Sequence, residues 1–95
     1  MKLRWTRRAL ADLGRVCDRI AEDKPAVAEA FAAAVFNKVE RLREFPLLGR
    51  IGALEDTREF VVHKNSLVTY RVRADEVQVL QVWHLARNLP RGGGR

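Results

Sequence analysis

The first half of the chain has hydrophobic residues at the spacing that predicts two helices. Residues 2–5 alternate polar and apolar and are followed by Thr6, a good helix N-cap, so they predict a short strand that leads into a helix over about 7–22. The apolar face of this helix is expected to consist of Leu10, Leu13, Cys17 and Ile20. The polar side chains expected toward its opposite face are Arg8, Asp12, Arg15 and Arg19.

A second apolar stripe follows closely and predicts a second helix packed antiparallel to the first. Asp23 is expected to cap this helix, and Pro25 to lie in its first turn, where a missing N–H has no helical partner to lose. The stripe consists of Val27, Ala30, Phe31, Ala34, Val35, Val39, Leu42 and Phe45. Pro46 is expected to end the helix, and the short connection between the two helices requires a hairpin.

The second half of the chain is rich in β-branched and aromatic residues and predicts a sheet. The expected strands are 60–62, 67–72 and 77–83. The order of elements therefore predicts an α+β fold: a short N-terminal strand and an antiparallel helical hairpin packed on a small antiparallel sheet. We expect residues 1–89 to form this single domain, and residues 90–95, which contain three consecutive glycines, to form a flexible tail.

The two faces of the predicted sheet follow from the pairing of its last two strands. An even-length hairpin over 73–76 places on the core face the pairs Val72–Val77, Tyr70–Val79 and Val68–Gln81. The opposite, open face then carries Leu67, Thr69, Arg71, Gln78, Leu80, Val82 and His84. A slip of one residue would reverse each of these assignments.

The preceding hairpin extends this pattern to the first of the three strands. Closed in the same way, it adds Phe60 and Val62 to the open face. It also sets Arg58 opposite Arg71, which makes a cationic pair. Such a face is too apolar for a plain solvated surface, so we expect it to be covered by a partner.

The composition narrows the chemistry that the chain can perform. The 95 residues carry a net charge of +6, and residues 60–95 hold six basic against two acidic side chains, which predicts an acidic partner. One cysteine and two histidines fall short of a disulfide or a structural zinc site, so neither a metal nor a cofactor is expected. The longest apolar run, 31–36, is far shorter than the roughly 20 residues of a membrane span, and the start is unlike a signal peptide, so we expect a cytoplasmic protein.

Local signatures along nearly the whole chain resemble the ParE/RelE toxin superfamily. They are Trp5 with residues 9–13, Phe45-Pro46 with Gly49-Arg50, Thr57-Arg58-Glu59 leading into Val61-Val62, Tyr70-Arg71-Val72, and Val82-Trp83-His84-Leu85-Ala86-Arg87. The resemblance implies the toxin half of a bacterial type II toxin–antitoxin pair. It also implies a hetero-oligomer with a neutralising antitoxin that is ParD-like or related.

The superfamily contains two activities, and the residues of this chain favour one of them. RelE-type members are ribosome-dependent mRNA endoribonucleases, which often use a late tyrosine, or a histidine with a glutamate, as acid and base. Here no glutamate follows His84, and the only tyrosine, Tyr70, is expected in the core. The ParE type, which inhibits DNA gyrase and is not an enzyme, resembles the sequence better through Arg58-Glu59 and the His84-x-x-Arg87 ending.

The preferred interpretation is therefore a ParE-like toxin that blocks replication by inhibiting gyrase until its antitoxin binds. One alternative is a RelE-like ribonuclease in which His84 is the acid or base and Arg58, Arg71 or Arg87 binds phosphate. The other alternative is a non-toxic basic module that binds protein or RNA. A histidine at a strand end is also common as a hydrogen-bonded structural residue.

The resemblance and the predicted faces together assign residues to two partners. The antitoxin is expected to offer apolar anchors and carboxylates to Arg58, Phe60, Val62, Leu67, Arg71, Leu80 and Val82. Gyrase is expected to contact His84, Arg87 and Arg91. Along its strand His84 lies about 20 Å from Gln78, the neighbour of Arg71, so His84 and Arg71 are not expected to share one small substrate.

Overall fold

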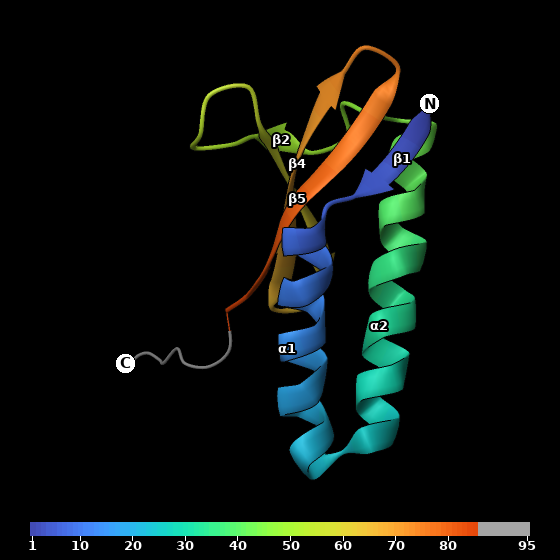
Figure 1. Cartoon of the computed structure of the whole chain (residues 1–95), viewed down its shortest axis with the longest axis vertical. Helices are drawn as coiled ribbons and strands as arrows, with labels where there is room; N and C mark the ends of the chain where they lie inside the picture. The colour runs from blue at the N-terminus through green and yellow to red at the C-terminus, as the bar shows by residue number, and fades with distance from the viewer. Residues whose placement is uncertain (86–95) are drawn as a thin grey trace.

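A helical hairpin covers one face of a five-stranded sheet in the computed structural model, which describes residues 1–85 (Figure 1). The helices are α1 (Arg7–Asp23) and α2 (Pro25–Glu40), and the 3₁₀ turn η1 (Arg41–Arg43) follows them. The strands are β1 (Lys2–Trp5), β2 (Arg50–Ile51), β3 (Arg58–His63), β4 (Ser66–Arg73) and β5 (Glu76–His84). The expected α+β fold is confirmed, while the proposed tail, 90–95, lies outside the described residues.

The two helices begin and end close to where the sequence predicted, with two exceptions. Thr6 caps α1 as expected, since its hydroxyl accepts a hydrogen bond from the Ala9 N–H at 3.1 Å. The prediction that Asp23 caps α2 is wrong, because Asp23 is the last residue of α1 and Lys24 occupies the cap position without a side-chain bond. The helix α2 also ends at Glu40, well before the predicted Pro46, because the chain tightens there into η1.

The buried face of α1 differs from the predicted one by a small rotation. Ala9 and Leu13 are fully or nearly fully buried, whereas Leu10 is 47% exposed. Asp12, expected on the polar face, is buried because its carboxylate accepts a hydrogen bond from the Val82 N–H of β5. The helix therefore turns a charged side chain toward the sheet, and that side chain is satisfied by the backbone beneath it.

The sheet is mixed, because its first strand is parallel to its last. The strand order is β1-β5-β4-β3-β2, and β1 pairs with β5 in parallel register, Leu3 opposite Val77 and Trp5 opposite Val79. The remaining pairs are antiparallel, and the predicted antiparallel pairings of β3 with β4 and of β4 with β5 are confirmed. Strand β2, which has only two residues, and the parallel pairing, which joins segments more than 70 residues apart, were not predicted from the sequence.

Two bulges correct the predicted faces of the sheet. The pairs Val72–Val77 and Tyr70–Val79 are confirmed, but Leu80 then has no partner on β4, and Val68 lies opposite Val82 instead of Gln81. This extra residue shifts the alternation of side chains by one position, so the residues of β5 after Leu80 exchange faces. Val82 and His84 therefore lie on the face that the helices cover, which we call the helix face, and the opposite sheet face is the open face.

The predicted faces of β3 are also wrong. Val62 has no partner on β4 and is 4% exposed in the core, and Phe60 packs against that core. Arg58 lies opposite Tyr70 rather than Arg71, so no cationic pair forms. An uneven hairpin, with a bulge between Val61 and His63, accounts for the shift of one position.

The core contains one buried tyrosine that ties the turn after η1 to the sheet. As predicted, Tyr70 lies in the core, where it is fully buried. Its hydroxyl donates a hydrogen bond to the Pro46 carbonyl at 2.7 Å and accepts one from the Gly49 N–H at 2.9 Å. Burial raises the pKa of the Tyr70 phenol, and the Gly49 N–H and the Arg58 charge offset part of this rise. The phenol is thus a structural cross-link and not a proton donor for chemistry.

Candidate functional site

The open face has an apolar end that is built from β3, β4, β5 and the loop before β3. Leu54, Val61, Trp83 and Leu85 are between 45% and 62% exposed. Part of this end is hollowed into a cavity of about 180 Å³, lined by Ala53, Leu54, Thr57, Glu59, Leu67, Thr69, Gln81, Trp83 and Leu85. The Trp83 indole N–H donates a hydrogen bond to the Thr69 hydroxyl at 2.9 Å, which holds the ring in place beside the cavity.

The other end of the open face carries a chain of polar side chains. The Arg71 guanidinium donates to the Gln78 amide oxygen at 2.9 Å, and the Gln78 amide donates to the Glu76 carboxylate at 2.7 Å. Arg4 also donates to Glu76. The hydrogen bond from Gln78, followed by the contact with Arg4, lowers the pKa of the Glu76 carboxyl. The open face is thus apolar at one end. At the other end it carries two arginines, Arg4 and Arg71, whose hydrogen bonds lead directly or through Gln78 to the one carboxylate of Glu76.

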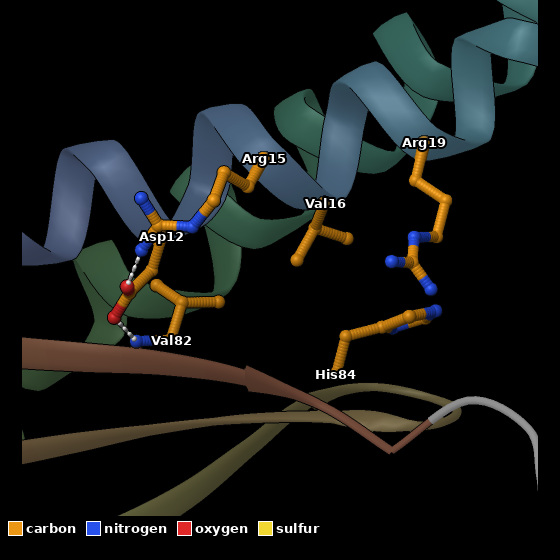
Figure 2. A pocket seen from close by; sticks show the side chains of 6 residues that line it. All are labelled: Asp12, Arg15, Val16, Arg19, Val82 and His84. Atoms are coloured by element: carbon orange, nitrogen blue, oxygen red, sulfur yellow. Dashed lines mark hydrogen bonds and ion pairs between the residues drawn. The ribbon is translucent and has the colours of Figure 1, made fainter.

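A second hollow lies on the helix face, between α1 and the end of β5, and we call it the α1–β5 pocket (Figure 2). It has a volume of about 290 Å³ and is lined by Asp12, Arg15, Val16, Arg19, Val82 and His84. Asp12 forms one wall: one carboxylate oxygen accepts from the Val82 N–H at 3.1 Å, and the other accepts from Arg8 and Arg15. The pocket therefore has an apolar floor and walls of charged side chains.

His84 closes the far end of the α1–β5 pocket. Its Nδ1 shares a hydrogen bond with the Ser66 hydroxyl at 2.7 Å, and its ring meets the edge of the Phe31 ring at a centroid distance of 5.8 Å. Figure 2 shows the Arg19 guanidinium directed toward the His84 ring from α1. The imidazole is thus held in a fixed orientation at one end of the hollow, with the Arg19 guanidinium directed toward it.

The structure does not bring together the side chains that were considered for ribonuclease chemistry. His84 lies on the helix face, whereas Arg71 lies on the open face and is bonded to Gln78, six residues before His84 on β5. The Arg58 guanidinium is directed at the turn before β2, where it donates to the Gly49 carbonyl at 2.8 Å. Arg87, the remaining candidate cation, lies outside the described residues, as does Arg91.

The residues expected to bind the antitoxin are also divided between the two faces. Leu67 and Arg71 lie on the open face, as predicted. Phe60, Val62 and Val82 lie on the helix face instead, and Leu80 is half-buried at the bulge. Val61 and Trp83, to which the sequence assigned no face, are instead large apolar side chains of β3 and β5 that the open face exposes, because the bulges shift the alternation by one residue.

Two further features of residues 1–85 bear on chemistry: the thiol of Cys17 and the placement of metal-binding side chains. Cys17 is half-buried between α1 and α2, 4.0 Å from the Ala28 carbonyl, and burial together with the Asp18 charge raises the pKa of its thiol. Within residues 1–85, no cluster of three His, Cys, Asp or Glu is placed to hold a metal ion. The helices of that part of the chain are too short or too polar to cross a bilayer.

A family model and two curated proteins match this chain over most of its length. The model of the family described as "ParE toxin of type II toxin-antitoxin system, parDE" matches residues 3–89. The Y4kP protein of Sinorhizobium fredii is 34% identical over 90 residues, 94% of this chain and 93% of its own length. Toxin RelE2 of Caulobacter vibrioides is 35% identical over 83 residues, 87% of this chain and 93% of its own.

Solved structures share the fold. The chromosomal ParDE TA system from P. aeruginosa matches with a TM-score of 0.84 and 24% identity, over 90% of this chain and 97% of that chain. The solution structure of HP0894 from Helicobacter pylori matches with a TM-score of 0.56 and 21% identity, over 88% of this chain and 93% of that one. At these identities the structural likeness concerns the arrangement of helices and strands.

Proposed function

Because the chain belongs to the ParE toxin family of type II toxin–antitoxin systems, we propose that it inhibits DNA gyrase when free and is neutralised when its antitoxin binds. The family match over residues 3–89 supports this proposal. The Arg58-Glu59 and His84-x-x-Arg87 motifs, which resemble the gyrase-inhibiting type, support it independently. In this proposal His84, with Arg87 and Arg91 after it, contacts the gyrase–DNA complex.

The observation that carries the proposal is the separation of the candidate catalytic groups. Cleavage of RNA needs an acid, a base and a cation within hydrogen-bond reach of one phosphate. In this fold His84 and Arg71 lie on opposite faces, and Arg58 is bonded to the Gly49 carbonyl. A protein that binds and stalls its target needs no such cluster, so the arrangement favours inhibition over catalysis.

The ribonuclease alternative has one observation in its favour. His84 and Arg19 face each other across the α1–β5 pocket, which places one imidazole and one cation together (Figure 2). A relative with 35% identity also carries the name Toxin RelE2. On this alternative, the Ser66 hydroxyl orients the imidazole through Nδ1, and His84 is the acid or base.

Two assays on the purified protein separate inhibition from cleavage. We expect the protein to block supercoiling of plasmid DNA by gyrase and to leave messenger RNA intact on translating ribosomes. Adding the cognate antitoxin first should restore supercoiling. Codon-positioned cleavage of the message, lost by about 10²-fold or more in His84→Ala, would instead establish the ribonuclease. Arg73→Ala is the control, because Arg73 is exposed and pairs with Asp56 far from the pocket.

Membership of a toxin–antitoxin family implies an antitoxin partner. We propose that this antitoxin covers the open face. The apolar end exposes Trp83 and Val61 beside a cavity that a single apolar side chain could fill. Arg71, at the basic end, offers a cation to an antitoxin carboxylate. An antitoxin segment with apolar residues at one end and acidic residues at the other fits this division.

Shortening Trp83 should therefore weaken antitoxin binding. We expect Trp83→Ala to raise the Kd at least about tenfold, because central aromatic anchors contribute much of the energy of an interface. Titration calorimetry with the antitoxin measures the change. Leu10→Ala is the matched control, since Leu10 is similarly exposed, at 47% against 45%, but lies on α1 beyond the opposite sheet face. Equal losses in both variants, or no loss at Trp83, would place the interface elsewhere.

A further inference from the structure

The α1–β5 pocket is lined by two arginines but by only one carboxylate, that of Asp12. Arg15 and Arg19 lie four residues apart on α1, and both line the hollow above β5. Asp12 is the pocket's carboxylate, and its oxygens are engaged by the Val82 N–H, Arg8 and Arg15. Among residues 1–85, no carboxylate forms an ion pair with Arg19. Arg8 and Arg15 thus share the pocket's one carboxylate, and Arg19 adds a positive charge that it does not neutralise.

The guanidinium groups of Arg15 and Arg19 point toward opposite ends of the pocket (Figure 2). Arg15 is bonded to Asp12, so its charge is already paired. The Arg19 guanidinium is directed instead toward the His84 ring. An anion seated between Arg19 and His84 would gain charge-assisted hydrogen bonds from Arg19.

We propose that the α1–β5 pocket binds a phosphate group, which Arg19 holds beside the ring of His84 (Figure 2). A phosphate suits this place because its oxygens accept charge-assisted hydrogen bonds from the Arg19 guanidinium. The volume of about 290 Å³ accommodates such a group. The site shares His84 with the gyrase proposal but does not depend on it, because phosphate binding is measured without gyrase.

The phosphate group has two chemical sources, a nucleic-acid backbone and a free nucleotide. Both present the same oxygens to the pocket, so Arg19 alone does not distinguish them. The test therefore begins with the shared group and then separates the sources.

Titration with inorganic phosphate at constant ionic strength, followed by two-dimensional NMR, tests the shared chemistry. We expect saturable shifts at the amides of residues 15–19 and 82–84. Arg19→Ala should raise the phosphate Kd about tenfold or more, and Arg19→Lys should recover part of the loss. Arg43→Ala, the matched control, removes an exposed arginine that pairs with Glu40 and should leave binding unchanged. Unsaturable shifts, or equal effects of Arg19→Ala and Arg43→Ala, would overturn the proposal.

Fluorescence anisotropy with a labelled DNA duplex and with a labelled nucleotide then separates the two sources. If the source is a backbone, Arg19→Ala should weaken duplex binding and reduce the salt slope of log K by about one. If the source is a nucleotide, Arg19→Ala should weaken nucleotide binding and leave the duplex affinity unchanged. Either result supports the phosphate site. Loss of neither interaction in Arg19→Ala would show that the pocket does not bind phosphate.

Discussion

Replacing Gly49 with alanine should lower the free energy of unfolding by about 3 kcal/mol, which would lower the Tm by at least about 12 °C in a domain of this size. A Cβ at this buried position would lie 2.7 Å from Tyr70 Cε1, 2.8 Å from the Tyr70 hydroxyl and 2.8 Å from the Glu59 carbonyl oxygen. Neither a buried ring nor a strand backbone can move away cheaply. The hydrogen bond from the Gly49 N–H to Tyr70 would also be displaced.

Urea unfolding of Gly14→Ala gives the matched control for this substitution. Gly14 lies exposed within α1, and an added Cβ there meets no atom within 4 Å. Alanine should therefore stabilise the protein at this position by up to about 1 kcal/mol, because it is the better helix former. If Gly49→Ala and Gly14→Ala changed the urea midpoint in the same direction, the close packing of the Gly49 turn against Tyr70 would be wrong.

Replacing Asp12 with alanine should cost about 2 kcal/mol of stability. The Val82 N–H would lose its acceptor in a buried place, and an unsatisfied buried donor costs more than a lost surface contact. The ion pairs contribute less, because the side chains of Arg8 and Arg15 are 63% and 68% exposed. The substitution also removes the carboxylate that binds Arg15 in the α1–β5 pocket, so it should raise the affinity for phosphate while it lowers the stability.

Two substitutions at acidic positions of α1 make this expectation specific. Asp12→Asn keeps an oxygen that can accept from the Val82 N–H, so it should lose less stability than Asp12→Ala. Asp18→Ala removes an exposed acid from the same helix and should change stability by no more than about 0.5 kcal/mol. Equal unfolding midpoints for Asp12→Ala and Asp18→Ala would contradict the role of the buried carboxylate.

The elements of the fold were predictable because their signals are local. Thr6 before a periodic apolar stripe marks the start of α1, and the alternation around Tyr70 and Val79 gives the register next to the last hairpin. These features depend on residues a few positions apart in the sequence. The class of fold and the buried position of Tyr70 followed from them.

The surfaces were predicted less well because they depend on irregularities that leave no mark in the sequence. The bulge at Leu80 moves Val82 and His84 to the helix face, reversing both assignments, and leaves Trp83 on the open face. Nothing in the alternation of β5 distinguishes a bulged strand from a regular one. The burial of Asp12 likewise depends on the Val82 N–H, a backbone group 70 residues away, although Asp12 and Arg15 have the three-residue spacing of a helical ion pair.

The parallel pairing of β1 with β5 determines when the protein is completed during its synthesis. The contacts within the α1–α2 hairpin are local and can form as soon as those residues have been made. β1 has no strand partner until Glu76–His84 has been made, and the open face and the α1–β5 pocket both need β5. A nascent chain that stops before β5 therefore carries neither surface. On the proposed function, the surface for the antitoxin and the surface for the target therefore form together, in one late step of synthesis.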